Sequence, residues 1–302
     1  MIARSPQQRL KLKAFECLCC QRRLTETNTF CPDCDTPADL SQTVATRGED
    51  KNFISMLGAS NSGKTVYIGM LLDMLHQGTQ DFHGLPGSSY SVHLQQHVIN
   101  SLTRRQFPPK TPSDADSWNW LHCEINTGTA KDQRINDLIC PDFAGEAIAA
   151  EILNPGFYPM IQTIVSKSSG ILLLCDAIAA QTNSVEEDLF ALKIATYIAR
   201  NHGLNPKNRR QHATHQTPRV AIVFTKTDGC SAAADHLHRF AESHLPRLTD
   251  YCKHTFDEHQ FFAASVAGNV IAVSDSTGIR SKIPVHITPK GILEPLRWLI
   301  NR

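Results

Sequence analysis

The sequence lacks three features that would place it in a specialised class of protein. No apolar run is long enough to cross a bilayer, and the longest, "GILLLCDAIAA" at 170–180, contains an aspartate. The basic start of the chain lacks the apolar core of a signal peptide. Neither sign of charge predominates, because the formal net charge is +1, so no overall attraction to nucleic acid or to a membrane is expected. We therefore expect a cytoplasmic globular protein without a membrane span.

Cysteine is present, and its spacing is regular only near the start of the chain. Of ten cysteines, those in regular spacing lie within the first 34 residues and form the pattern C-x2-C-x10-C-x2-C. In a cytoplasmic protein such thiols are metal ligands more often than disulfides. Four thiolates in this arrangement bind Zn²⁺ tetrahedrally, and so short a segment needs a metal to fold. The predicted zinc ligands are Cys17, Cys20, Cys31 and Cys34.

Two other interpretations of these thiols stay open. Cys19 is either a spare thiol or a substitute for Cys17. A redox pair is the alternative to zinc, although no C-x-x-C lies at a predicted strand-to-helix turn.

From about residue 50, short β-rich runs alternate with helical patterns. The expected strands are 52–58, 118–126, 134–140, 170–177, 219–225 and 260–266. The expected helices are 64–76, 143–169, 185–201, 231–254 and 290–301. This alternation predicts an α/β fold with a mostly parallel sheet and helices on both of its faces. The segments 78–117, 202–218 and 268–289 are predicted to be irregular, the last with a hairpin around "DSTG".

The predicted organisation has four parts. They are a basic segment at 1–13, a zinc ribbon at 14–40, a linker at 41–50 and the α/β domain at 51–302.

The segment "GASNSGKT" at 58–65 follows an apolar strand, precedes a helix and fits G-x-x-x-x-G-K-[ST]. A helix N-terminus with a glycine-rich loop binds phosphates through backbone N–H groups. Lys64 is expected to reach the β- and γ-phosphates, and Thr65 to coordinate Mg²⁺. The expected nucleotide contacts are Gly58, Ala59, Ser60, Asn61, Ser62, Gly63, Lys64, Thr65 and Val66.

A second motif, "LICPDFAGE" at 138–146, places an acidic residue after a buried strand. An aspartate at such a strand end can hold the Mg²⁺ shell of a P-loop enzyme, and Asp142 fits that role. Gly145 follows three residues later and could bring its backbone N–H against a γ-phosphate.

A third motif ends the strand in "AIVFTKTDGC" at 221–230. Thr225-Lys226-x-Asp228 is similar to the guanine-recognition element of GTPases, which usually reads Asn-Lys-x-Asp. Asp228 would accept hydrogen bonds from the guanine N1–H and exocyclic amine, and adenine lacks that donor pair. A fourth motif, "FFAASVAG" at 261–268, contains Ser265 and Val266. The backbone that follows Ser265 can contact the guanine O6.

With these four motifs in order, residues 52–302 resemble a Ras-like P-loop GTPase of the translation-factor-related class. Within that class the chain is most similar to the bacterial double-GTPase families, which occur in multigene systems linked to conflict or defence. This closer similarity rests on "FPPKTP", "DFAGE" and "EPLRWLI". The resemblance implies a switch protein that binds Mg²⁺ and GTP, hydrolyses GTP to GDP and phosphate, and is regulated by a co-encoded protein partner.

The resemblance also implies a first switch loop at "QFPPKTP", 106–112. Thr111 is the expected threonine that contacts Mg²⁺ and the γ-phosphate, with Thr103 and Thr127 as alternatives. A rigid proline-rich connector is the other interpretation of this segment. Glu146 stands where a glutamine often orients the attacking water, so slow or partner-dependent hydrolysis is expected. The expected catalytic residues are Lys64, Thr111, Gly145 and Glu146.

Two other functions stay open. One is a GTP-binding adaptor that hydrolyses weakly, which Glu146 favours. The other is a nucleic-acid-binding NTPase that uses the zinc ribbon, because basic residues such as Arg22 and Arg23 lie in that segment.

Overall fold

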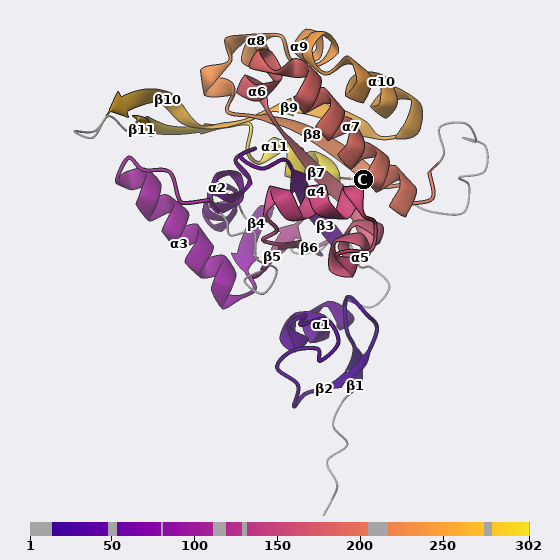
Figure 1. Ribbon diagram of the computed structural model, residues 1–302. Coiled ribbons are helices and arrows are strands. Elements are labelled where there is room, and N and C mark those ends of the chain that lie inside the picture. The colour runs from indigo at the N-terminus through magenta and orange to yellow at the C-terminus, as the bar shows by residue number, and fades with distance from the viewer. Residues whose placement is uncertain are drawn as a thin grey trace, which may run out of the picture. The chain divides into compact units, whose positions relative to one another are not determined.

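The structure is a computed structural model that describes residues 14–47, 53–79, 81–110, 119–128, 132–204, 217–274 and 280–301. The described residues form two compact units, one at 14–47 and one from residue 53 onward (Figure 1). Among these residues, no helix combines the length and the apolar character needed to cross a membrane.

The smaller unit combines an antiparallel pair of short strands with one helix. The strands β1 (Ala14–Glu16) and β2 (Arg23–Thr25) pair, and helix α1 (Ala38–Ala45) packs beside them through Leu40 and Val44. Ser41 Oγ accepts a hydrogen bond of 3.1 Å from the Leu18 backbone N–H. The helix continues to Ala45, so the first half of the segment predicted as a linker at 41–50 is helical and belongs to this unit.

The larger unit is built on a seven-stranded sheet. Across the sheet the strands are β4 (Phe82–Pro86), β5 (Trp120–Thr127), β6 (Arg134–Pro141), β3 (Phe53–Gly58), β7 (Ser168–Asp176), β8 (Arg219–Thr225) and β9 (His259–Ala263). Strands β6, β3, β7, β8 and β9 run parallel, whereas β4 and β5 are antiparallel to their neighbours. The mostly parallel sheet that the sequence predicts is confirmed.

Helices cover both faces of this sheet (Figure 1). One face carries α2 (Lys64–His76), α3 (Ser89–Thr103) and α11 (Glu294–Ile300). The other carries α4 (Gly145–Leu153), α5 (Pro159–Lys167), α7 (Ser184–Asn201), α9 (Leu237–His244) and α10 (Pro246–Thr255). Two short helices, α6 (Ala177–Thr182) and α8 (Ser231–Asp235), follow strand ends.

The central strands are buried on both faces, which explains their nearly continuous apolar sequences. Along β7, Ile171 and Leu173 pack into one hydrophobic core, and Leu172 and Leu174 pack into the other. Because successive side chains of a strand point to opposite faces, a run of apolar residues supplies both cores at once. The sheet is therefore a rigid platform, and the C-terminal ends of its parallel strands lie at one edge.

The prediction of irregular structure over 78–117 is wrong for half of that segment. It contains strand β4 and the helix α3. The helix was missed because its apolar stripe is narrow: Leu94, Val98 and Leu102 are buried, and most of the residues between them are polar. Strand β4 contains Gly84 and Pro86, which usually mark turns.

Two predicted helices are divided. The pattern at 143–169 forms α4 and α5, separated by a loop that contains Pro155 and Gly156. The pattern at 231–254 forms α8, α9 and α10, and a proline begins the last of these. In both cases a proline lies at a break: Pro155 is in the loop between α4 and α5, and Pro246 begins α10.

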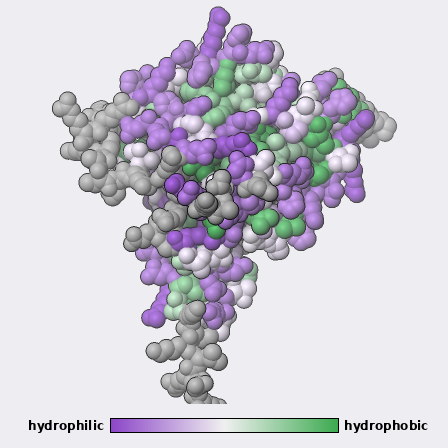
Figure 2. All heavy atoms as spheres, turned by 180° about the vertical axis from the view of Figure 1, so that it is seen from behind, coloured by the Kyte–Doolittle hydropathy of each residue, from purple (hydrophilic) through white to green (hydrophobic). Residues whose placement is uncertain are grey.

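The predicted hairpin is present as β10 (Ser265–Ser274) and β11 (Arg280–Lys290), which form a separate antiparallel pair. It projects from the body of the unit at the left of Figure 1. Ile271, Val273 and Ile287 are exposed on it. Seen from behind, hydrophobic side chains reach the surface beside the grey residues of its tip (Figure 2).

Candidate functional site

A cavity of about 560 Å³ lies at the C-terminal edge of the parallel strands. It brings together residues that the sequence separates by about 200 positions, from the loop after β3 to the start of β10. The predicted site residues that line it are Ser60, Asn61, Gly63, Lys64, Thr65, Val66, Gly145, Glu146, Thr225, Lys226, Asp228, Ser265 and Val266.

The loop between β3 and α2 forms one end of the cavity. Asn61 and Gly63 adopt left-handed backbone conformations, with φ of 63° and 82°. This path turns the chain so that Gly63 stands at the N-cap of α2, directly before Lys64. The N-terminus of a helix attracts anions because its first N–H groups lack intrahelical partners and the helix dipole is positive there. This end of the cavity is therefore suited to phosphate groups.

Lys64 is partly buried beneath the loop that it follows. Its Nζ donates hydrogen bonds to the carbonyl oxygens of Gly58, at 3.0 Å, and Ala59, at 2.8 Å. Burial lowers its pKa to about 8, although the negative charges of Asp142 and Glu146 oppose that shift. The lysine is thus held as a cation with reduced basicity inside the loop.

Asp142 lies just after β6, as predicted, but it faces a second, much smaller cavity that Lys64 also lines. The hydroxyl of Tyr90, in the first turn of α3, donates to Asp142 Oδ2 at 2.5 Å. Burial raises the pKa of Tyr90, and the negative Asp142 adds to that effect, so the phenol stays a hydrogen-bond donor. Tyr90 escaped the sequence analysis because its segment was predicted to be irregular.

Gly145 begins α4 and packs directly on the loop after β3. A Cβ at this position would lie 2.1 Å from Ser60 N and 2.4 Å from Ser60 Cα, so no larger residue fits without a backbone shift. Glu146 accepts a hydrogen bond of 3.0 Å from Ser60 Oγ and forms an ion pair with Lys110 Nζ. The hydrogen bond from Lys110 is the main cause of a lowered Glu146 pKa.

Thr111, the threonine predicted for the first switch, lies outside the described residues. Of its alternatives, Thr103 is in the last turn of α3, where its hydroxyl donates to Ile99 O at 2.8 Å. Thr127 is buried at the end of β5. Both alternatives are thus fixed in regular elements. Residues just before Thr111, including Phe107 and Lys110, line the cavity.

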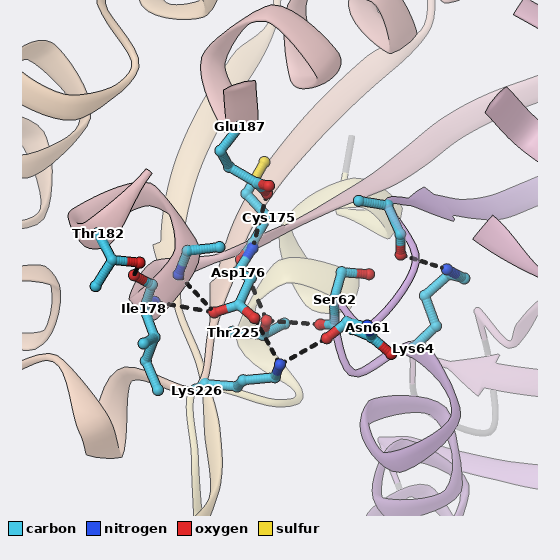
Figure 3. Close-up of polar contacts among 12 residues, drawn as sticks. Asn61, Ser62, Lys64, Cys175, Asp176, Ile178, Thr182, Glu187, Thr225 and Lys226 are labelled. Carbon is cyan, nitrogen blue, oxygen red and sulfur yellow. Dashed lines mark hydrogen bonds and ion pairs between the residues drawn. The ribbon is translucent and has the colours of Figure 1, made fainter. Parts of the chain in front are cut away.

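The turn after β8 forms the other end of the cavity. Figure 3 shows the polar contacts of Thr225 and Lys226 in this turn. Thr225 Oγ1 donates to Ser62 O at 2.7 Å and lies 3.2 Å from Cys175 O. Lys226 has a left-handed backbone, with φ of 58°, and its Nζ donates to Asn61 O at 2.6 Å. The threonine and the lysine thus join this turn to the loop after β3, even though a threonine replaces the usual asparagine.

Asp228 lies in a short 3₁₀ turn, Thr227–Gly229, beside the start of β10. Thr227 donates to Ala264 O through its backbone N–H, at 3.3 Å, and through its hydroxyl, at 3.1 Å. These bonds fix the turn against the segment that leads to Ser265 and Val266. Burial raises the pKa of Asp228.

In the smaller unit the four predicted zinc ligands come together. Their Sγ atoms lie within 4.8 Å of one another, with Cys17 and Cys34 at 3.5 Å and Cys20 and Cys31 at 3.4 Å. Four sulfurs at about 2.3 Å from a tetrahedral zinc would be about 3.8 Å apart, so this group of thiols fits the ion. Cys19 is buried as well, but it is not one of the four clustered thiols.

The comparison with protein families gave one result. A family model described as Double-GTPase 2 matches residues 52–283. The match runs from the start of β3 into β11 and leaves the four-cysteine unit outside. A search of curated proteins gave no match.

Solved structures resemble the chain at low sequence identity. The signal recognition particle receptor SRb–GTP/SRX complex from Chaetomium thermophilum is 16% identical over 72% of this chain and 92% of that chain, with a TM-score of 0.37. The Ski7 GTPase-like domain of S. cerevisiae, bound to GDP and inorganic phosphate, is 15% identical over 87% of this chain and 52% of that chain, with a TM-score of 0.42. With TM-scores this low, nothing about ligand or activity follows from these likenesses.

Proposed function

The chain belongs to the Double-GTPase 2 family, and we propose that it is a switch protein that binds GTP and hydrolyses it to GDP and phosphate. One observation carries the proposal. A single cavity has a phosphate-binding helix N-terminus at one end and the Thr225-Lys226-x-Asp228 turn at the other. The four motifs are far apart in sequence, so their convergence on one cavity supports a common ligand.

Guanine is the base that suits the second end. An ionised Asp228 offers only acceptors, which match the N1–H and exocyclic amine of guanine. Adenine would leave the half-buried carboxylate without donors, and an unpaired buried charge is costly. The aliphatic stem of Lys226 would cover the base, and the backbone after Ser265 would meet the guanine O6.

The phosphate end suits Mg²⁺ as well. The hydroxyl of Thr65 and the carboxylate of Asp142 are oxygen donors of the kind that Mg²⁺ prefers, and Thr111 is the third candidate ligand. When bound, the ion would supply positive charge that neutralises the negative charge developing during phosphoryl transfer. The chain's own contribution there is Lys64, whose ammonium would move from the Gly58 and Ala59 carbonyls to the phosphates.

Hydrolysis by the isolated protein should be slow. Glu146 occupies the position of a water-orienting glutamine, and its carboxylate is engaged by Ser60 and Lys110. A carboxylate can accept a proton from water but cannot donate a hydrogen bond to the transferring phosphoryl group. We therefore propose regulation by a protein partner, a co-encoded effector or regulator in a bacterial system of the conflict or defence kind. The partner would sense residues 103–112 and 142–156.

The same Glu146 contacts favour a second candidate function, a GTP-binding adaptor that barely hydrolyses. Single-turnover hydrolysis with and without co-encoded proteins separates the two. Stimulated phosphate release identifies a regulated enzyme, and slow release that no partner stimulates identifies an adaptor.

The four-cysteine unit is proposed to be a structural zinc site and a docking module. The purified protein should contain about one zinc ion per chain, the capacity of one four-thiolate site. Nucleic acid is the less favoured partner of this unit, because the net charge of the chain is only +1. A steep salt dependence of nucleic-acid binding would reverse that order.

Titration of the purified protein with labelled GTP and labelled ATP tests the central proposal. GTP should bind far more tightly than ATP. Asp228→Asn should shift preference toward xanthine nucleotides, because the asparagine amide can donate to the 2-oxo group that xanthine has in place of the exocyclic amine of guanine. Asp250→Asn makes the same chemical change at an exposed site and should leave GTP affinity unaltered. Equal affinity for GTP and ATP would refute the assignment of guanine.

A further inference from the structure

A carboxylate outside the four motifs lies at the centre of the contacts between the two ends of the cavity. Asp176 is the last residue of β7, and it stands beside Thr225 in the register of β7 and β8. Its position at the C-terminal edge of the sheet brings it next to Lys226, fifty positions further along the chain.

The two carboxylate oxygens of Asp176 have different partners (Figure 3). Oδ1 caps α6 by accepting hydrogen bonds from Ile178 N, at 2.9 Å, and Ala179 N, at 3.1 Å. Oδ2 accepts from Lys226 Nζ at 2.5 Å. Because the cap fixes the plane of the carboxylate, the second oxygen has a defined position.

The ammonium of Lys226 is therefore held from two sides. It donates to Asp176 Oδ2 and, at 2.6 Å, to Asn61 O in the phosphate-binding loop. A lysine stem has many rotamers, and ordering it only when a ligand arrives would reduce affinity. Partners on both sides select one rotamer in advance.

We propose that Asp176 is a positioning residue for the guanine nucleotide, which holds the Lys226 ammonium against the phosphate-binding loop so that the lysine stem is in place to cover the base. The inference rests on the proposed function and adds a residue to the same site. Asp176 acts through Lys226 and, at a distance, through the charge that it brings near Asp228.

The negative charge of Asp176 should affect the pH dependence of nucleotide binding, which a purely structural role would not do. Burial is the main cause of the raised Asp228 pKa; of the two charges that act on it, Asp176 raises this pKa and Lys226 lowers it. Glu187 accepts a hydrogen bond from the Asp176 backbone N–H and is the charged side chain behind it. Guanine needs Asp228 ionised, so binding is lost as pH falls through this pKa. Removal of the Asp176 charge lowers the pKa and moves that loss to lower pH.

The test variant is Asp176→Asn in the full-length protein. Asparagine caps helices about as well as aspartate, so α6 keeps its cap while Lys226 loses its ionic partner. A fluorescent GDP analogue and a fluorescent GTP analogue should both bind about tenfold more weakly at neutral pH. The losses should be equal, because the contact lies away from the γ-phosphate. In a plot of affinity against pH, the midpoint of the loss of binding on the acid side (the acid limb) should move to lower pH. Asp176→Ser, which also caps, repeats the test if the first variant folds poorly.

A double-mutant cycle tests whether Asp176 acts through the lysine. In a Lys226→Met background, which keeps an apolar stem without the ammonium, Asp176→Asn should change affinity by less than about twofold. Asp250→Asn, with the same loss of charge at an exposed site, should leave the affinity and the midpoint unchanged.

Three outcomes would overturn the inference. They are wild-type affinity in Asp176→Asn, a weaker affinity with an unmoved acid midpoint, and losses that simply add in the double mutant. Each of these can occur while the wild-type protein still prefers GTP to ATP, in which case the proposed function stands and only the role of Asp176 falls. Failure of the wild-type protein to bind either analogue would instead refute the proposed function.

Discussion

The two ends of the proposed nucleotide cavity are built differently. At the base end, Thr225 and Asp176 belong to central strands. The hydrogen bond from the Thr225 hydroxyl to the phosphate-binding loop is buried, and the Asp176–Lys226 ion pair is partly buried, with side chains 14% and 37% exposed. At the γ-phosphate end, Glu146 joins the elements through a hydrogen bond from Ser60 and an ion pair with Lys110. The side chains of Lys110 and Glu146 are 57% and 43% exposed. One end is anchored in the sheet, and the other is closed by a surface contact.

This difference teaches which end can move. Exposed ion pairs contribute about 0–1 kcal/mol, so solvent and a phosphate group can replace the contact of Glu146 and Lys110 at little cost. Changes at the base end would have to break hydrogen bonds of buried backbone carbonyls, which is costlier. A switch protein needs this combination, because GTP and GDP share the base and differ only at the γ-phosphate.

The largest expected effect comes from Lys64, which serves both nucleotides. Lys64→Ala should weaken GTP and GDP by about 100-fold or more, because it removes a partly buried cation from the phosphate groups. Isothermal titration measures both affinities, and Lys253→Ala, at an exposed ion pair, is the control. Wild-type affinity in Lys64→Ala would show that the loop does not bind phosphate.

Gly145→Ala should separate the two ends. The added Cβ would collide with Ser60 backbone atoms, so the start of α4 must move away from the phosphate-binding loop. We expect hydrolysis and GTP affinity to fall about tenfold, the scale of an overpacked site, with GDP affinity nearly unchanged. Gly170→Ala in β7, where the nearest atoms are 3.4 Å from the Cβ, should have a much smaller effect. An equal loss for GDP would contradict a switch confined to the γ-phosphate end.

The affinity for GDP should depend on pH through one group at each end of the cavity. Burial lowers the pKa of Lys64 to about 8, so affinity should decline as pH rises above that value and the free lysine loses its charge. The raised pKa of Asp228 has the opposite consequence, because affinity should decline as pH falls through it. Asp228→Asn should abolish the acid limb alone. If both limbs survived in that variant, Asp228 would not be the base-end titrating group.

The smallest expected effect is that of Glu146→Gln. The glutamine amide can still accept the hydrogen bond from Ser60, but it loses the ion pair with Lys110 and gains an N–H donor. Single-turnover hydrolysis should therefore rise a few-fold, while GDP affinity stays constant. Glu242→Gln, at another exposed lysine pair, is the matched control. A slower reaction would indicate that the carboxylate itself takes part in hydrolysis.

Much of the site could be predicted because its motifs are contiguous. The phosphate-binding loop, the Asp142 segment and the Thr225-Lys226-x-Asp228 turn each follow a buried strand, and parallel strands end at one edge of a sheet. Strand ends in a predicted parallel sheet therefore predict a common site without knowledge of the strand order. The four cysteines follow the same logic, since two C-x2-C turns suffice to place four sulfurs.

Other parts of the fold gave weak local signals. Helix α3 has a narrow apolar stripe among polar residues, and β4 carries a glycine and a proline, so neither was predicted. With α3 unpredicted, Tyr90 had no assigned position, and its hydrogen bond to Asp142 was not expected. The apolar period of 143–169 and 231–254 was correct, but the breaks within it depend on backbone turns.

The sequence by itself determined the family, the α/β class, the motifs that line the cavity and the grouping of the four thiols, because each depends on residues adjacent in the chain or on short, regular spacings. Only the tertiary structure decided which side chains meet across those motifs. Asp176 with Lys226, Tyr90 with Asp142 and Lys110 with Glu146 are separated by 50, 52 and 36 positions. Such pairs depend on strand order, register and the path of helices, and no local pattern of polarity encodes which distant partner a single charged side chain will find.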